Sequence, residues 1–392
     1  MTRHAYAGNT AIAGIGATAF TKNSGKSELR LAVEACVAAC DDAGIDPSEV
    51  RGLSTFTMEN NTENEVMRSL GIPELTHFSR IHFGGGAPCG TIQLAAMAVN
   101  EGIADYVLCY RAFNERSGRR FGSGVQDQPA GATTEQAQYS WSSPYGLLTP
   151  ASWVAMFATR MMHEFGVTSE DFGRIAVADR KHAATNPAAH FFGRPITLEE
   201  HQASRWIVEP LHLLDCCQES DGGQALLVTT LERARDLRQR PAVIAGGAQG
   251  MADGQQMMRS YFRDSLVDLP EMATCARQLW ESSGLSAADI QTAVIYDHFT
   301  PLVLPQLELF GFCPRGEAKD FIADGNIEVG GELPINTHGG QLGEAYIHGM
   351  NGIAEAVRQV RGTAVNQVDG VHHALVTAGT AVPTSALVLS GL

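Results

Sequence analysis

The alternation of apolar and polar positions follows the same plan in both halves of the chain. Residues 32–56 contain a helical pattern that ends near Gly44, then a short polar turn, then the apolar run Gly52–Phe56. Residues 272–296 repeat this order, with Gly284 after the helical pattern. Because glycine commonly ends helices and a bounded apolar run is typical of a buried strand, each copy predicts a helix followed by a buried strand.

Three further pairs of segments match in the same order. They are an opening apolar strand, a glycine-rich turn that enters a helix, and the apolar strand after that helix: Thr10–Gly14 with Ala242–Gly246, Gly84–Gly86 with Gly339–Gly340, and Tyr106–Tyr110 with Ala374–Thr377. Alternating strands and helices predict a mixed or parallel sheet covered by helices. We therefore expect an α/β fold built from two similar halves, residues 1–240 and 241–392.

The segment at about residues 114–239 finds no counterpart in the second half. Its start, near residues 117–143, is rich in Gly, Ser and Gln, which predicts a long irregular excursion of the kind that often carries specificity. The segment also contains a set of basic residues, which either meet an anionic ligand or form a solvated surface: Arg116, Arg119, Arg120, Arg160, Arg174, Arg180, Lys181 and Arg194.

The charge of the chain narrows the classes of function. Its 392 residues carry 28 Lys and Arg against 43 Asp and Glu, which gives a formal net charge of −15. Such an acidic chain argues against binding to nucleic acid or to an anionic membrane, because both favour a basic face. No signal-peptide pattern and no apolar run of about 18 residues is found, so we expect a soluble, cytoplasmic protein.

Neither the cysteines nor the histidines indicate a metal site. The 8 cysteines include no Cys-x-x-Cys pair and do not suggest a disulfide framework, so we expect reduced, mostly buried thiols. His372 and His373 are adjacent, and adjacent side chains of a strand point to opposite faces. We therefore expect no metal ion between them.

Two tyrosines stand where a family of acyl-transferring enzymes has histidines. Residues 339–349 read Gly-Gly-Gln-Leu-Gly-Glu-Ala-Tyr-Ile-His-Gly, which resembles a thiolase motif whose catalytic histidine is replaced here by Tyr346. Residues 296–299, Tyr-Asp-His-Phe, resemble the His-Asp-Cys-Phe segment of sterol-carrier-type thiolases, again with tyrosine first. The resemblance covers nearly the whole chain and implies the duplicated five-layer αβαβα thiolase fold. Two replacements of the same kind suggest a repurposed site.

The two cysteines of a thiolase are also missing from the matching positions. Alignment of Gly84–Gly86 places Ala87 at the nucleophile position, and Cys89 lies two residues later, which turns its side chain by about 200° around a helix. The second cysteine position falls in Ala378–Thr380, where the backbone of Gly379 is a candidate oxyanion donor. Claisen chemistry through an acyl-cysteine is therefore expected to be blocked.

A pair of phenols suits a different reaction. A phenol with a pKa of about 10 is a poor base at pH 7 but a good positioned acid or hydrogen-bond donor. Residues 109–118, 216–222 and 348–352 resemble the lipid-transfer-protein branch of the sterol-carrier thiolases of actinobacteria, whose members cleave steroid side chains by an aldolase reaction. The resemblance implies a carbon–carbon lyase that cleaves a 17-hydroxy-steroid-20-carboxyl-CoA to a 17-ketosteroid and propionyl-CoA.

The resemblance also implies roles for individual residues. Tyr296 and Tyr346 would form the acid/base pair, with His298 as the candidate third catalytic group. Neighbouring residues would bind the substrate or stabilise the enolate oxygen: Gly379, Asn336, His338, Glu344 and His348. The basic residues of the excursion are candidates for contact with the phosphates of coenzyme A. Two other functions stay open, a thiolase that uses an activated Cys89 thiolate and a non-catalytic carrier of steroid-CoA or lipid.

The expected partners follow from the same resemblance. Thiolase-like proteins commonly dimerise, and the segment Tyr106–Phe113 and the helix after Gly90 are the candidate dimer contacts. The resemblance implies a second partner, a small protein with an OB-fold and a zinc ribbon that is associated with a hydratase. No cofactor bound by this chain is expected, because the substrate itself carries coenzyme A.

Overall fold

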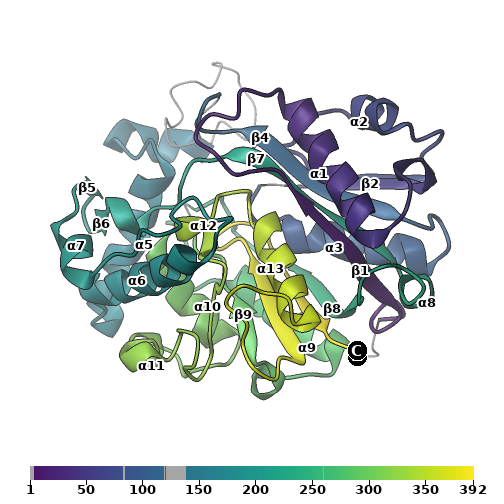
Figure 1. Cartoon of the computed structure of the whole chain (residues 1–392). Helices are drawn as coiled ribbons and strands as arrows, with labels where there is room; N and C mark the ends of the chain where they lie inside the picture. Colours follow the sequence, from purple (N-terminus) through teal and green to yellow (C-terminus); the bar gives the residue numbers. More distant parts are fainter. Residues whose placement is uncertain (1–3, 83, 119, 121–137, 259) are drawn as a thin grey trace.

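One mixed sheet of nine strands runs through the molecule (Figure 1). The structure, a computed structural model, describes residues 4–82, 84–118, 120, 138–258 and 260–392. Along the sheet the strands follow the order β3-β2-β4-β7-β1-β8-β11-β10-β9. Their bounds are β1 Thr10–Ala17, β2 Gly52–Phe56, β3 His77–Ile81, β4 Val107–Asn114, β7 Asp221–Thr230, β8 Ala242–Gly250, β9 Thr292–Val294, β10 His373–Ala378 and β11 Thr384–Ser390.

The strand order reads the same outward from the centre in both directions. The first strands of the two halves, β1 and β8, pair antiparallel at the centre. Next come β7 and β11, both antiparallel to their inner neighbours, and then β4 and β10, again antiparallel. Outside these, β2 is parallel to β4 and β9 is parallel to β10. The predicted duplicated α/β fold is confirmed, while the boundary after residue 240 stays a prediction.

Helices cover the sheet in layers (Figure 1). On one side α1 (Glu28–Ala43) packs on β1, β7 and β4, and on the other α9 (Pro270–Ser283) packs on β8 and β11. Between the two halves of the sheet, α3 (Pro88–Asn100) and α13 (Met350–Arg361) contact each other and strands of both halves. The layers are therefore α1, N-terminal strands, α3 with α13, C-terminal strands and α9, which confirms the predicted αβαβα arrangement.

Glycines in the first strand of each half let the outer helix approach closely. A Cβ at Gly14 of β1 would lie 2.1 Å from the carbonyl oxygen of Ala39 in α1. A Cβ at Gly250 of β8 would lie 2.0 Å from the carbonyl oxygen of Glu271 in α9. Because any larger residue would push the helix away, the close helix–strand packing is a repeated property of the two halves.

The predicted excursion at residues 114–239 is more regular and shorter than expected. From residue 150 onward it contains the helices α5 (Pro150–Phe165), α6 (Ser169–Thr185) and α7 (Leu198–Ala203) and the hairpin β5 (Trp206–Val208) with β6 (Leu211–His212). It also contains β7. This strand has the same place among the N-terminal strands as β11 has among the C-terminal strands. The segment without a counterpart therefore ends before Asp221. Residues 119 and 121–137 of its predicted irregular start lie outside the described residues.

The other helical segments are short. They are α2 (Glu63–Leu70), α8 (Leu231–Ala234), α10 (Val303–Leu309), α11 (Ala318–Phe321) and α12 (Gly340–Gly343), with 3₁₀ turns at Pro47–Glu49, Gln138–Trp141, Ser143–Tyr145, Leu213–Asp215, Ala287–Asp289, Thr300–Leu302 and Ala323–Gly325. Within the described ranges, no helix combines the length and the apolar character that a membrane crossing requires.

The segments predicted as dimer contacts are interior. Residues 107–113 of the predicted segment lie in β4, which pairs with β7 along its whole length and with β2 at Val107, Leu108 and Cys109. These residues are buried within the single chain, and their role as dimer contacts stays a prediction. The helix after Gly90 is α3, which lies mostly buried between the two halves of the sheet. The free edge of the N-terminal strands is β3.

Candidate active site

The two tyrosines singled out by the sequence meet in the structure. Tyr296 follows the end of β9, and Tyr346 lies between α12 and α13. The Tyr296 hydroxyl donates a hydrogen bond to the Tyr346 hydroxyl at 3.2 Å. Tyr296 is only 2% exposed, whereas Tyr346 is partly exposed. The arrangement brings together two phenols that are 50 residues apart in the sequence.

The position of Tyr296 is fixed from its backbone and from its ring. Its backbone N–H donates to Thr377 Oγ1 at 3.0 Å, and its carbonyl oxygen accepts from Gln306 Nε2 at 2.7 Å. A Cβ at Gly85 would lie 2.0 Å from the Tyr296 hydroxyl oxygen, and one at Gly349 would lie 2.9 Å from its ring. The glycine-rich turn of the N-terminal half therefore lies directly against the phenol supplied by the C-terminal half.

Tyr346 is held by a turn that three separate segments build. Its backbone N–H donates to Ser220 Oγ at 3.1 Å. The carboxylate of Asp297 accepts the backbone N–H groups of Gln341 at 2.9 Å and Leu342 at 3.1 Å, which fixes the α12 turn against the end of β9. Close contact is possible because a Cβ at Gly340 would lie 2.1 Å from Asp297 Oδ2.

A second carboxyl group lies beside Asp297. Burial and the charge of Asp297 raise the pKa of Asp179 in α6 well above its usual range. Burial also raises the pKa of Asp297, and the two backbone N–H groups that donate to its carboxylate oppose this rise. The α12 turn thus rests on two neighbouring buried carboxyl groups, and sequence reasoning did not find Asp179.

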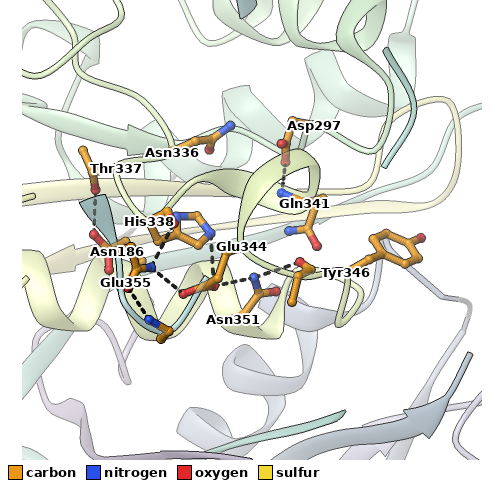
Figure 2. A network of polar contacts seen from close by, with 12 residues as sticks. Asn186, Asp297, Asn336, Thr337, His338, Gln341, Glu344, Tyr346, Asn351 and Glu355 are labelled. Atoms are coloured by element: carbon orange, nitrogen blue, oxygen red, sulfur yellow. Dashed lines mark hydrogen bonds and ion pairs between the residues drawn. The ribbon is translucent and has the colours of Figure 1, made fainter. Parts of the chain in front are cut away.

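Three of the predicted substrate-binding residues, Asn336, His338 and Glu344, lie in a buried polar network beneath the Tyr346 loop (Figure 2). Glu344 accepts from Asn351 Nδ2 at 2.8 Å and from Asn186 Nδ2 at 3.1 Å, and its Oε2 lies 3.9 Å from His338 Nε2. In Figure 2 the ring of Tyr346 points away from this network.

Asn336 ties the same network to the end of β9. It adopts a left-handed backbone with φ of 48°, and its Oδ1 accepts the Ile295 N–H at 2.9 Å. The network therefore supports the two segments that carry the tyrosines. Direct contact of Asn336, His338 and Glu344 with substrate stays a prediction.

The two histidines near the phenols are neutral. The His298 ring lies 4.9 Å from the Tyr296 ring, and the His348 ring lies 4.8 Å from the Tyr346 ring, centroid to centroid. Burial lowers the pKa of His298 to about 3. Burial, followed by the charge of Arg111, also lowers the pKa of His348 well below its usual range. Near neutral pH both rings are therefore available as hydrogen-bond partners but carry no charge.

A buried ion pair next to His348 was not found by sequence reasoning. Arg111 on β4 is only 1% exposed, and its Nη1 donates to Glu59 Oε2 at 2.9 Å. Its Nε donates to His348 Nδ1 at 3.3 Å, and its guanidinium carbon lies 4.2 Å from the centroid of the Phe113 ring. Glu59 also accepts the Ala112 backbone N–H at 2.9 Å. The pair fixes one ring nitrogen of His348 as an acceptor.

Both phenols are held in the protonated form. Burial raises the pKa of Tyr296 and of Tyr346 well above 10, and nearby Glu115 and Cys217 also raise both. Glu115 is itself buried, its Oε2 has no partner among the described residues, and its pKa is raised well above the usual range by burial. The Cys217 backbone N–H donates to the His298 carbonyl oxygen at 2.9 Å. Neither residue was a sequence candidate, although Cys217 lies in a segment that carried the family resemblance.

The thiolase nucleophile position contains no thiol. Ala87 lies there, directly before α3, and is fully buried. Cys89 points into the core, where its Sγ lies 3.7 Å from the Val376 carbonyl oxygen, and burial raises its pKa well above the usual range. A buried neutral thiol is a poor nucleophile, so the geometry argues against a thiolase that uses Cys89.

Backbone groups come close together at the position of the second thiolase cysteine. A Cβ at Gly379 would lie 2.5 Å from the Gly86 Cα, and Gly379 has a φ of 70°. The two glycine turns therefore meet beside the Tyr296 hydroxyl, which contacts the neighbouring Gly85. Two hollows are lined by described residues, one beside Phe165 and Leu304 and the other beside Phe157 and Ala381, and neither has Tyr296 or Tyr346 in its lining. Hydrogen bonding and burial, not the size of a hollow, locate this site.

Comparison with known proteins gives a consistent family. Residues 254–390 match the family model "Thiolase C-terminal domain-like". The chain is 66% identical to a steroid side-chain-cleaving aldolase of Thermomonospora curvata, covering 97% of this chain and 98% of that protein. It is 64% identical to the 17-hydroxy-3-oxo-4-pregnene-20-carboxyl-CoA lyase of Mycobacterium tuberculosis, covering 97% and 99%.

A solved structure agrees with these relatives. A chain of the solved Ltp2-ChsH2(DUF35) aldolase superimposes with a TM-score of 0.94 at 65% identity, covering 99% of each chain. The resemblance inferred from the two tyrosine segments is therefore confirmed. The chain belongs to the thiolase superfamily, in the thiolase-like branch that contains the steroid side-chain-cleaving aldolases.

Proposed function

We propose that the protein is a retro-aldol lyase that cleaves a 17-hydroxy-steroid-20-carboxyl-CoA to a 17-ketosteroid and propionyl-CoA. The observation that carries the proposal is the hydrogen bond between the Tyr296 and Tyr346 hydroxyls, 3.2 Å long, in a thiolase fold with Ala87 at the nucleophile position. The names of the two relatives that match nearly the whole chain describe an aldolase and a lyase of this class.

The reaction balances without an oxidant, a reductant or a covalent intermediate. The substrate alcohol loses its proton, and its carbon–oxygen bond becomes a carbonyl. The bond between the carbinol carbon and the carbon α to the thioester breaks, and its electron pair forms the thioester enolate. The α-carbon then takes up one proton, which gives propionyl-CoA. A proton leaves one carbon fragment and a proton enters the other, so the site must move a proton between two places.

A hydrogen-bonded pair of phenols can perform this transfer without storing a phenolate. One phenol accepts the alcohol proton as it passes its own proton to the second phenol, and the second phenol protonates the α-carbon. Because burial raises the pKa of both hydroxyls well above 10, a route that keeps both neutral before and after each turnover is favoured. The hydrogen bond between Tyr296 and Tyr346 is the connection that such a route needs.

The remaining groups have supporting roles in this proposal. Gly379, whose backbone meets Gly86, supplies an N–H toward the enolate oxygen, since fixed backbone donors stabilise developing oxyanions. His298 and His348 are neutral rings beside the phenols and orient them or the substrate. Asn336, His338 and Glu344 position the Tyr346 loop through the network beneath it. Coenzyme A enters as part of the substrate, and we assign no cofactor of its own to the chain.

Assembly with other chains is part of the proposal. The name of the similar aldolase structure includes a second component, ChsH2(DUF35), and we infer that this chain binds a small partner of the same kind, predicted from the family resemblance to be an OB-fold with a zinc ribbon. We also infer a homodimer that forms at the free edge of β3, where Phe78 is 68% exposed. We place the protein in the cytoplasm.

The test supplies the 17-hydroxy-steroid-20-carboxyl-CoA to the full chain, alone and with the small partner, and measures propionyl-CoA by mass spectrometry. Wild type should release propionyl-CoA. Tyr296→Phe and Tyr346→Phe should each lower the turnover rate about a thousandfold, because general acid–base catalysis contributes on the order of 10²–10⁴. Substrate binding should persist in both variants. Tyr145→Phe is the matched control, since Tyr145 is 81% exposed.

Other outcomes would contradict the proposal. Wild-type rates in both tyrosine variants would exclude the assigned roles. Formation of acetyl-CoA from acetoacetyl-CoA and CoA, with loss on alkylation of Cys89, would indicate a thiolase. Binding of the steroid thioester without turnover, even with the partner present, would indicate a carrier.

A further inference from the structure

The ring of His348 is clamped by residues of the N-terminal half. It stacks on the Phe113 ring, with centroids 5.0 Å apart and an interplanar angle of 24°, and it meets the Phe56 ring edge-on at 6.2 Å. The guanidinium carbon of Arg111 lies 4.2 Å from the centroid of Phe113 and 6.0 Å from that of Phe56. His348 is 3% exposed, so these contacts leave its ring little room to rotate.

The backbone at His348 is also unusual. Its φ of 51° lies in the left-handed region, and Gly349 follows with a φ of 86°. A residue with a Cβ adopts this conformation at an energetic cost, and such positions concentrate at functional sites. The strained turn holds an imidazole whose ring centroid lies 4.8 Å from that of Tyr346 and whose Nδ1 lies 3.3 Å from Arg111 Nε.

Arg111 determines which nitrogen of this imidazole carries the hydrogen. A guanidinium Nε can donate a hydrogen bond but cannot accept one, so His348 Nδ1 must be the acceptor of the bond from Arg111. Burial and the charge of Arg111 lower the pKa of His348 well below its usual range, so the ring is neutral and its one N–H is at Nε2. Glu59, itself buried, holds the guanidinium in place by accepting from Nη1 at 2.9 Å.

Nε2 of His348 faces the glycine-rich turn that receives Tyr296. A Cβ at Gly84 would lie 3.4 Å from Nε2, and a Cβ at Gly85 would lie 2.0 Å from the Tyr296 hydroxyl oxygen. The imidazole N–H and the phenol hydroxyl therefore border the same turn. In a thioester enolate the oxygen and the α-carbon are joined through one carbon, so a donor to the oxygen must lie near the group that protonates the α-carbon.

We propose that His348 donates a hydrogen bond from Nε2 to the thioester oxygen as the enolate forms, and that Arg111, held by Glu59, is a positioning residue that fixes this tautomer. A neutral imidazole N–H stabilises the developing charge without giving up its proton, whereas an imidazolium is acidic enough to protonate the oxygen. His348 then acts together with the Gly379 backbone N–H. This inference rests on the proposed function, since it assumes that a thioester enolate forms beside the two phenols.

The tautomer is tested by ¹⁵N NMR on the full chain labelled at histidine, with the signals of His348 identified by their loss in His348→Gln. Wild type should show an unprotonated Nδ1 and a protonated Nε2. Arg111→Met combined with Glu59→Gln removes both charges of the buried pair and should populate the Nδ1–H form, because the donor to Nδ1 is lost. The matched control is Arg361→Met, which breaks another ion pair of a buried arginine, with Asp42 at 2.9 Å, and should leave the tautomer unchanged.

The donor role is tested by the kinetics of propionyl-CoA release. The amide of glutamine can place an N–H near the position of Nε2, whereas the shorter asparagine places it near Nδ1. His348→Asn should lower kcat about a hundredfold with little change in KM, because an oxyanion donor acts mainly in the transition state. His348→Gln should recover about tenfold of this loss, since it restores a donor near the oxygen.

Three results would overturn the inference. They are an Nδ1–H tautomer in wild type, an unchanged tautomer in the Arg111→Met and Glu59→Gln double variant, and equal kcat values for His348→Asn and His348→Gln. Absence of lyase activity in wild type would overturn the proposed function and the donor role with it. Lyase activity in wild type with an unchanged kcat in His348→Asn would overturn the donor role alone, so the two failures are distinguishable.

Discussion

Each half of the molecule contains a strand followed by a glycine-rich turn and a helix, and both turns lie at the tyrosine pair. The two turns have different roles there. In the N-terminal half, Gly84–Gly86 lead almost directly into α3. In the C-terminal half, the turn at Gly339 and Gly340 starts the four-residue α12, and residues 344–349 intervene before α13. The first turn supplies space for the Tyr296 hydroxyl, and the second supplies Tyr346.

The halves also differ in how their buried polar groups are charged. The N-terminal half contributes the ion pair of Arg111 with Glu59, which is buried and hydrogen-bonded to His348. The C-terminal half contributes the two phenols and His298, all of which burial holds neutral. The two halves therefore share one scaffold but have different roles: the N-terminal half supports the site, and the C-terminal half supplies the groups proposed to transfer protons. Changes in the N-terminal half should damage stability or geometry, and changes in the C-terminal half should damage the chemistry or its pH dependence.

The largest expected effect comes from removing the cation of the N-terminal half. Arg111→Met leaves Glu59 buried without its partner, and breaking a buried ion pair costs about 3–5 kcal/mol of the free energy of unfolding. Urea unfolding measures this cost, and the double variant Arg111→Met with Glu59→Gln should recover part of it. Arg120→Met breaks a surface pair with Glu219 and should cost less than about 1 kcal/mol. If Arg111→Met and Arg120→Met lowered the free energy of unfolding equally, the buried ion pair would not differ from the surface pair in its contribution to stability.

The contact between the halves is tested at Gly85. A Cβ added by Gly85→Ala would lie 2.0 Å from the Tyr296 hydroxyl oxygen, so the phenol must move. We expect about a hundredfold loss of turnover, because misplacement by about 1 Å can cost this much. In the double variant with Tyr296→Phe the added Cβ still meets the ring, whose nearest carbon lies 2.6 Å away, but the hydroxyl that transfers the proton is already absent. The double variant should therefore turn over about as slowly as Tyr296→Phe alone. Additive losses would show that Gly85 acts elsewhere.

The neutral state of the buried His298 ring in the C-terminal half predicts that the free energy of unfolding depends on pH. The pKa of His298 falls from about 6.5 in the unfolded chain to about 3 in the folded one. Its contribution is therefore fully present above about pH 6.5 and is lost as the pH falls toward 3. At pH 5 the loss is roughly 2 kcal/mol of the free energy of unfolding. His298→Asn should make the stability change between pH 7.5 and 5 smaller by this amount, whereas the exposed His372→Asn should not.

The smallest effect is expected at the cysteine nearest the lost nucleophile. Cys89→Ala removes a fully buried thiol and should cost about 1 kcal/mol of stability, the typical size for a point substitution. Turnover to propionyl-CoA should stay at the wild-type level, because the thiol points into the core. A large loss of turnover in a stably folded Cys89→Ala protein would restore the thiolase hypothesis.

Local patterns in the sequence were sufficient for the scaffold and for the two phenols. Helix stops at Gly44 and Gly284 and the apolar strands after them depend on neighbouring residues, and each half repeats them. Tyr296 and Tyr346 were visible because they replace histidines inside recognisable glycine-rich and strand-end segments. The excursion predicted at residues 114–239 was too long because it included β7. This strand occupies the same place in the sheet as β11, but its residues do not resemble those of β11 closely enough to reveal the match.

The sequence by itself therefore determined a duplicated α/β fold and two tyrosines in unusual places. Only the tertiary structure decided that their hydroxyls touch, that Asp179 shares a site with Asp297, and that Arg111 reaches His348 across 237 positions of the chain. Such contacts join residues far apart in the sequence, so no local periodicity encodes them. Their electrostatic consequences follow from burial, because a group gains or loses its proton according to how much water and which charges remain beside it in the folded protein.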